Sequence, residues 1–202
     1  MFSISADGRT LIQGTEKLAT TVYYDPDVAT IGYGHAIVMN GHQVSIKALG
    51  RAAADQQAQA YMMSKFGKTT ITDADAQALF NEDMASFTKA VNAVCDASTY
   101  QCEFDAMVSF AFNCGVGGFN SSSVAKFHKA NQRTVGDISM SDLATWSKGH
   151  SNPTNIQQAF AAWSKDNGAW ELGLYRRRLE ELLVYAGHKA AEAYTTAWSF
   201  KG

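Results

Sequence analysis

The sequence predicts an α+β fold that is predominantly α, with one small β-hairpin near the N-terminus. Apolar residues recur at steps of three and four over most of the chain after residue 47, which is typical of helices packed on a core. β-Branched and aromatic residues gather instead in two short runs, 22–24 and 29–33. The length of 202 residues suits one domain, so we expect a single domain over residues 1–202 with a small β lobe at about 15–40.

The N-terminal elements place the first polar residues of interest. A short helix is expected over residues 5–13, starting at a capping serine and ending near Gly14. That end would leave Glu16 just beyond the helix. The two β-type runs are separated by Asp25, Pro26 and Asp27, which favour a turn and therefore a hairpin.

The remaining chain predicts helices. A capping-type segment at 72–75 opens the clearest of them, and Gly115 ends the most apolar one. Gly117, Gly118 and the serines at 121–123 predict a turn, as do residues 166–168. The expected helices cover residues 51–65, 72–94, 101–113, 124–130, 142–148, 156–164, 174–185 and 190–198.

Charge and hydropathy exclude several classes of protein. The formal net charge is −2 and the pI is about 6.2, so the chain offers no global positive field for nucleic acid. We expect no signal peptide and no stable membrane insertion, because no basic segment precedes an apolar one at the start and no run of about 18 apolar residues occurs.

The three cysteines, Cys95, Cys102 and Cys114, cannot all pair within the chain. A bridge between Cys95 and Cys102 remains open at this stage, and Cys114 suits a small buried apolar site. No CxxC or HExxH spacing accompanies the histidines, so no metal and no cofactor are expected.

Glu16 and Asp25 form the candidate catalytic pair. Cleavage of a glycosidic bond needs one protonated carboxyl group and one ionised carboxylate. Glu16 stands beside aliphatic Leu18, where partial burial favours the protonated form, whereas Asp25 lies in a wetter turn. Thr30 could hold a water molecule together with Asp25. Each residue alone has an ordinary structural explanation, so the hypothesis depends on their combination.

The segment after Thr30 has unusual glycines. Gly32 and Gly34 flank Tyr33, and glycine weakens a strand unless a backbone or a ligand must approach closely. A sugar chain is one such ligand, and tyrosines offer it flat apolar faces. Packing of the hairpin on the rest of the protein explains these tyrosines equally, and His35 is more typical of a hydrogen-bonded structural histidine than of a catalyst.

These residues resemble a known signature. Glu16, then Tyr24-Asp25, then the segment Thr30-Ile31-Gly32-Tyr33-Gly34-His35 is similar to the motif of the phage-type lysozymes, the muramidase endolysins of glycoside hydrolase family 24. Further similarity runs through residues 71–83, 101–119, 163–165 and 173–178, in the order of that family.

The resemblance implies a lysozyme-like fold, with a small β-hairpin lobe, a larger helical lobe and the active-site cleft between them. It implies that Glu16 is the general acid, that Asp25 positions the attacking water and that Thr30 is its partner. The implied substrate is peptidoglycan, cut by hydrolysis between N-acetylmuramic acid and N-acetylglucosamine. The resemblance further implies that four residues contact the substrate: Tyr33, Gly34, His35 and Asn113.

One arginine of the run 176–178 is implied as a partner of Glu16, and we choose Arg177. The chain departs from the family pattern in three places. The interval from Asp25 to Thr30 is one residue shorter than usual, and Lys17 replaces the glycine that usually follows the acid. Residues 42–70 and 133–157 form longer segments than usual, for which contact with the cell wall or plain surface decoration are both open.

Two other functions stay open at the sequence level. A lytic transglycosylase needs only one glutamate, and the presence of Asp25 and Thr30 argues against it; a non-catalytic wall-binding module would not need both carboxylates. The Asp25–Thr30 pair predicts an inverting enzyme for bacterial lysis, with carboxyl groups about 6.5–9.5 Å apart. The resemblance implies that the protein accumulates in the host cytoplasm and reaches the wall after the membrane is permeabilised, and a monomer is the default expectation.

Overall fold

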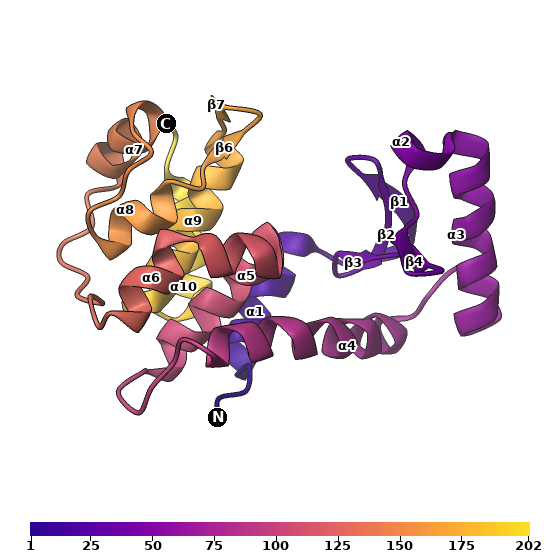
Figure 1. Cartoon of the computed structure of the whole chain (residues 1–202), viewed down its shortest axis with the longest axis horizontal. Coiled ribbons are helices and arrows are strands. Elements are labelled where there is room, and N and C mark those ends of the chain that lie inside the picture. Colours follow the sequence, from indigo (N-terminus) through magenta and orange to yellow (C-terminus); the bar gives the residue numbers. More distant parts are fainter. The chain divides into compact units, whose positions relative to one another are not determined.

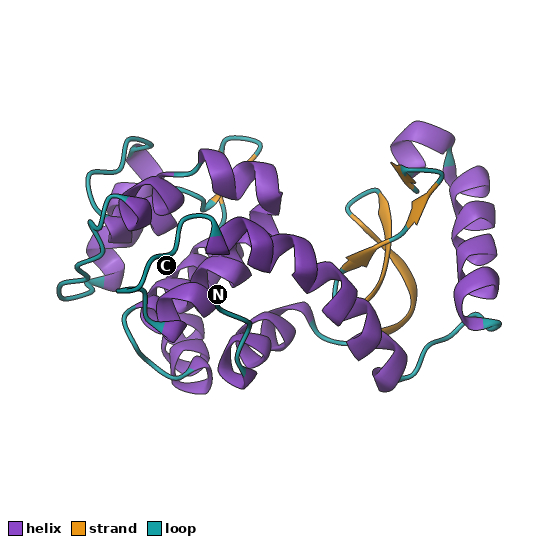
Figure 2. Cartoon of the chain, turned by 60° about the horizontal axis from the view of Figure 1, so that its bottom comes forward, coloured by secondary structure: helices purple, strands orange, loops and turns teal.

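The protein, described by a computed structural model over residues 1–202, divides into two compact units (Figure 1). One unit is Glu16–Ala85, and the other combines Met1–Thr15 with Ser86–Gly202. The predicted α+β class with predominant helix is confirmed, since the strands are few and short (Figure 2).

The unit Glu16–Ala85 contains the predicted hairpin. Strand β1 (Ala19–Asp25) pairs antiparallel with β2 (Val28–Gly32), and a short third strand, β3 (His35–Ala36), pairs with the other side of β2. Pro26 and Asp27 form the two-residue turn between β1 and β2.

The rest of this unit includes helices whose apolar side chains share a core with the sheet. The helices predicted over 51–65 and 72–94 are present as α3 (Arg51–Phe66) and α4 (Asp73–Asn92), and the first part of α4 belongs to this unit. The core consists of apolar side chains, including Ala29 and Ile31 of β2 and Ala54, Ala58 and Met62 of α3. The sequence did not predict the second hairpin, β4 (Val38–Met39) and β5 (His42–Gln43), or the short helix after it, α2 (Ile46–Leu49).

The second unit is helical apart from one small hairpin. Its centre is α9, which packs against α5 and α10 (Figure 1). The ring of Phe110 contacts the rings of Phe119, Phe160 and Trp163 at centroid distances of 5.5–6.4 Å. The elements are α1 (Ala6–Glu16), α5 (Gln101–Ser121), α6 (Ser123–Lys129), α7 (Met140–Gly149), α8 (Ile156–Ala161), β6 (Lys165–Asp166), β7 (Ala169–Trp170), α9 (Leu172–Tyr185) and α10 (Ala190–Ser199).

The predicted end of the most apolar helix at Gly115 is confirmed in part. Gly115 has φ 75° and ψ 159°, which is not helical, yet helix resumes and α5 continues to Ser121. The predicted turn at Gly117 and Gly118 is therefore wrong. A β-carbon on Gly118 would lie 3.3 Å from the Trp163 ring and 3.2 Å from Cys114, so close packing explains this glycine.

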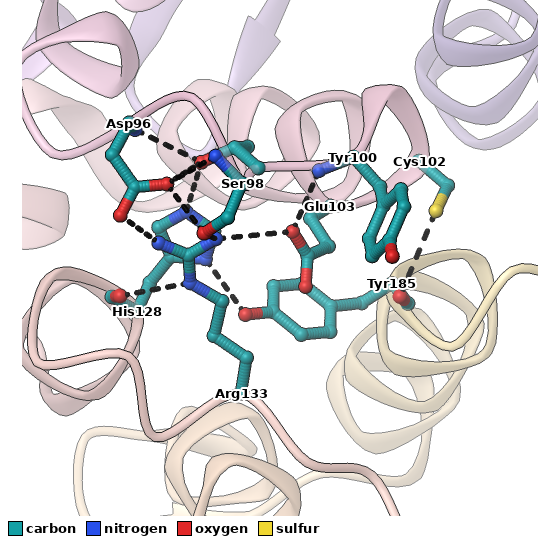
Figure 3. Close-up of polar contacts among 9 residues, drawn as sticks. Asp96, Ser98, Tyr100, Cys102, Glu103, His128, Arg133 and Tyr185 are labelled. Carbon is teal, nitrogen blue, oxygen red and sulfur yellow. Dashed lines mark hydrogen bonds and ion pairs between the residues drawn. The ribbon is translucent and has the colours of Figure 1, made fainter.

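Arg133 anchors the segment that follows α6 (Figure 3). Its guanidinium donates to Asp96 Oδ2 at 2.6 Å, to Ser98 Oγ at 3.1 Å and to the His128 carbonyl at 3.1 Å. Glu103 Oε2 lies 3.7 Å from the same group. Because the side chain of Arg133 is only 8% exposed, these bonds fix the start of the long segment 133–157.

His128 belongs to the same cluster and is fully buried. Its Nε2 lies 3.1 Å from Thr99 Oγ1 and its Nδ1 lies 2.7 Å from the Tyr185 hydroxyl (Figure 3). Burial, and then the positive charge of Arg133, lower the pKa of His128 to about 4. The neutral imidazole is thus the form that the folded protein holds.

All three cysteines are free, which settles the open question about Cys95 and Cys102. Burial raises the pKa of Cys95 to about 11 and that of Cys114 to about 12, and it raises the pKa of Cys102 as well. None of the helices combines the length and the apolar character that crossing a membrane requires.

Candidate active site

Glu16 is the last residue of α1, not a residue beyond it as the sequence predicted. Gly14 continues the helix, and Lys17 ends it by taking the left-handed conformation, with φ 57°. Glycine usually fills this position after a helix because it lacks the β-carbon that makes the conformation costly. The general acid candidate therefore stands at the helix end, next to a strained lysine.

Tyr23, Asp25 and Thr30 lie on one face of the hairpin. In the β1–β2 register Tyr23 is opposite Thr30 and Asp25 is opposite Val28, and side chains of opposed residues share a face of the sheet. The other face carries Tyr24, Ala29 and Ile31, which pack on the core of this unit. The strand pairing thus brings two of the predicted catalytic residues together.

Tyr23 joins Glu16 to this face. The pKa of its hydroxyl is raised by burial first, and then by the negative charges of Glu16 and Asp25. Both carboxylates are therefore close enough to Tyr23 for their charges to act on it. Tyr23 was not among the residues predicted for the site, although its spacing of two residues from Asp25 in a strand was the signal that could have identified it.

The hydroxyl of Thr30 is oriented by its own strand. It donates to the Val28 carbonyl at 2.9 Å, and the residue is 3% exposed. Because the proton is used in this bond, the lone pairs of Oγ1 remain as acceptors. Thr30 can accept a hydrogen bond from a water molecule but has no proton left to give it.

Tyr33 and His35 have hydrogen-bond partners within their own unit, and Gly34 between them takes a left-handed backbone conformation, with φ 83°. The Tyr33 hydroxyl donates to Asp73 at 2.8 Å, and the His35 ring nitrogens lie 3.0 Å from Asp83 and 2.9 Å from the Tyr61 hydroxyl. A predicted contact of these three residues with substrate stays a prediction.

Gly32 is explained by its backbone conformation. The residue has φ 68°, a left-handed conformation that favours glycine. A β-carbon there would lie 3.4 Å from Ala76 of α4, which is an ordinary van der Waals contact, so no unusually close neighbour is needed to explain this glycine.

The remaining predicted residues lie in the other unit. Asn113 is exposed on α5, just before the break at Gly115. Arg177 is buried, with Nε 3.7 Å from Glu181 Oε1, whereas Arg176 donates to the Phe200 carbonyl and Arg178 to Glu181. The predicted pairing of Arg177 with Glu16 stays a prediction, as do the cleft between the lobes and the contact of Asn113 with substrate.

The fold and this face of the hairpin define a class of protein. The sequence model of the phage lysozyme family matches residues 13–155, which include the candidate catalytic residues. The chain belongs to the phage lysozyme family.

Individual relatives agree with this assignment. An endolysin of Bacillus phage PZA is 26% identical over 185 residues, which are 90% of this chain and 54% of that protein. The endolysin of Bacillus phage B103 is 25% identical over 189 residues, again 54% of that protein. The chain thus spans about half the length of the curated relatives that it matches.

Solved structures confirm the predicted lysozyme-like fold. The endolysin from Escherichia coli O157:H7 phage FAHEc1 superposes with a TM-score of 0.62 at 25% identity, covering 92% of this chain and 94% of that one. The muramidase domain of SpmX from Asticaccaulis excentricus gives a TM-score of 0.62 at 24% identity, with 93% and 100% covered.

Proposed function

We propose that this protein is an endolysin that hydrolyses the β-1,4 bond between N-acetylmuramic acid and N-acetylglucosamine in peptidoglycan. The observation that supports it best is the hairpin face that carries Tyr23, Asp25 and Thr30, with the charge of Glu16 acting on the same tyrosine. Membership of the phage lysozyme family agrees with this chemistry.

In this mechanism the two carboxyl groups do opposite work. Glu16 donates its proton to the leaving glycosidic oxygen, and the bond from that oxygen to the anomeric carbon breaks. A water molecule attacks the anomeric carbon from the other side, and Asp25 accepts a proton from it. The released sugar then carries the inverted anomeric configuration, and exchange with solvent restores the two carboxyl groups to their starting forms.

Thr30 positions the water. A water molecule has two protons, and in this arrangement Asp25 accepts one and Thr30 Oγ1 the other, which leaves an oxygen lone pair for the attack. The bond from Thr30 to the Val28 carbonyl favours this role, because it prevents the hydroxyl from donating to the water and blocking that lone pair. The same observation favours hydrolysis over a transglycosylase, which has no attacking water to hold.

The test is digestion of purified peptidoglycan by the wild type and by Glu16→Gln and Asp25→Asn. Each substitution should lower the rate by about 10²–10⁴-fold, the range for loss of an acid or base. Glu192→Gln, which removes an exposed carboxylate of α10, is the matched control and should digest normally.

The products and the binding separate the alternatives. Reducing muramic ends of inverted configuration support the mechanism, whereas chiefly anhydro-muramic ends would assign the protein to the transglycosylases. Wall binding by sedimentation should survive Glu16→Gln. Binding without any digestion by the wild type would indicate a wall-binding module.

The place of action follows from the substrate. The protein acts on the bacterial cell wall, as a monomer, from the host cytoplasm and after a separate lesion has opened the membrane. Lysis from outside should then require permeabilised cells, and light scattering after size exclusion should give the mass of one chain. Lysis of intact cells by protein added from outside would contradict this route.

A further inference from the structure

A polar pocket lies along the long segment 133–157 and the start of α8, wholly within the unit that contains α7 and α8. Its volume is about 410 Å³, within the range of about 300–1,000 Å³ of small-molecule sites. The helices α7 and α8 contact each other beside it (Figure 1). The residues that line it are Asp137, Ser139, Asp142, Leu143, Trp146, Asn155, Gln157 and Gln158.

Four polar groups of this lining make no hydrogen bond within the protein. Asn155 uses Oδ1 to accept from the Gln158 backbone, and Gln158 uses Oε1 to accept from Thr154, so both amide NH₂ groups remain. The carboxylates of Asp137 and Asp142 likewise have no partner among the hydrogen bonds and ion pairs, in which only the backbone of each residue takes part. The pocket therefore offers two acceptors and two donors.

Trp146 gives the pocket an aromatic wall. The His150 ring stacks on it with centroids 5.7 Å apart and planes at 8°, so one face of the indole is already covered. The remaining surface of Trp146 contributes to the pocket. An indole provides a broad apolar surface with few rotatable bonds, so it binds a flat ligand at little cost in conformational entropy.

The polar groups are held in place before any ligand arrives. Ser139 caps α7 and Asn155 caps α8. The Gln157 amide donates to the carbonyls of Gly136 and Asp137 at 3.3 and 3.2 Å, which fixes the loop that carries the first carboxylate. Arg133 anchors the start of the same loop. A preorganised site loses less entropy on binding.

We propose that this pocket is an accessory binding site for an N-acetylhexosamine unit of the glycan strand. The hydroxyl groups of such a sugar donate to the two carboxylates, its oxygens accept from the two amides, and the apolar face of its ring lies against Trp146. No lysine or arginine lines the pocket, so an anionic ligand is disfavoured, and a simple cation would leave both amides unused. The identity of the polymer rests on the proposed function; the pocket itself does not.

The test uses the full chain with Glu16→Gln, to prevent cleavage, and the tetramer of N-acetylglucosamine as the probe. The indole N–H signals are followed by NMR, with Trp146→Phe to assign the signal of Trp146. We expect that signal to shift on titration. Asp142→Asn should weaken the titrated affinity about 3- to 10-fold, because asparagine keeps one acceptor oxygen but loses the charge that strengthens the hydrogen bond. Glu192→Gln is the matched control and should leave the affinity unchanged.

Three results would overturn the assignment. The first is a Trp146 signal that stays fixed while other signals shift, which would leave the proposed function intact and remove this site. The second is an affinity in Asp142→Asn equal to that in Glu192→Gln. The third is tighter binding in this pocket of the tetramer of glucosamine, which is cationic, than of its N-acetylated form; the site would then be one for ammonium groups. Digestion of peptidoglycan by the wild type is measured separately, so failure of the enzyme proposal remains distinguishable.

Discussion

Two glycines of α1 should respond in opposite directions to the same substitution. Gly8 is buried, and a β-carbon built on it would lie 2.6 Å from Asp105 Oδ1 and 2.9 Å from Asp105 Cβ. Gly14 lies two turns later in the same helix, and nothing lies within 4 Å of the corresponding position. The two residues therefore form a matched pair for replacement by alanine.

The clash at Gly8 cannot be relieved cheaply. Asp105 is 2% exposed, and its carboxylate accepts hydrogen bonds from the Ser5 backbone and hydroxyl and from Gln101. Overpacking costs about 1–3 kcal/mol, and three Asp105 atoms at 2.6–2.9 Å place this clash in the upper half of that range, above the gain of about 1 kcal/mol in helix propensity. We expect Gly8→Ala to destabilise the protein by about 1–2 kcal/mol and Gly14→Ala to stabilise it by about 0.5 kcal/mol.

Urea unfolding followed by circular dichroism measures both changes in the free energy of unfolding. In a thermal scan of the same variants, each kcal/mol should move the melting temperature by about 2–4 °C for a chain of this size. Equal shifts of the same sign in the two variants would refute the reasoning, because propensity alone would then account for them. A neutral Gly8→Ala would show that α1 and α5 can separate by a few tenths of an ångström at no cost.

Three further predictions concern single residues. Lys17→Gly should stabilise the protein by about 1 kcal/mol by relieving the left-handed backbone, whereas Lys17→Ala should not; equal stability of the two variants in urea would contradict this. His128 stays neutral in the folded state down to its pKa of about 4, so the unfolded chain binds the extra proton first as pH falls. Stability should therefore fall by up to roughly 3 kcal/mol as pH drops from about 6.5 to 4. His128→Gln should flatten this pH dependence, measured as the midpoint of urea unfolding. Burial raises the pKa of Glu180 to about 7, so stability should instead fall as pH rises from about 4.5 through 7. Glu180→Gln, whose amide oxygen can still accept the hydrogen bond from Trp198 Nε1, should remove that loss of stability in the same assay.

The sequence predicted the elements better than it predicted their ends. The helix periodicity and the turn between the two β-type runs depend on neighbours in the chain, and both are present in the structure. Asp25, which the sequence placed in that turn, is instead the last residue of β1, so the turn consists of Pro26 and Asp27 alone. The end of α1 was not, because Gly14 is an ordinary stop signal whereas the residue that takes the left-handed conformation is Lys17. A lysine carries no local signal for that conformation, so only the surrounding structure determines it.

In the candidate site, too, local sequence signals were informative and long-range contacts were not predictable. The sequence indicated that Asp25 and Thr30 belong to one hairpin, because β-type runs and turn residues are local signals, but their shared face follows from the strand register of the structure. The partners of His35, by contrast, are Asp83 and Tyr61, which lie 48 and 26 residues away in the chain. Long-range partners of this kind follow from packing, and no spacing in the sequence indicates them.

The three free cysteines have a practical consequence for experiments in solution. With a pKa of about 11 for Cys95 and about 12 for Cys114, roughly one thiol in ten thousand or fewer is ionised at pH 7. Alkylating reagents and disulfides react with the thiolate, so the native thiols should react slowly. A cysteine introduced at an exposed position could therefore be labelled with a fluorophore or a spin probe without first removing the native ones, and distances within each unit could be followed during turnover.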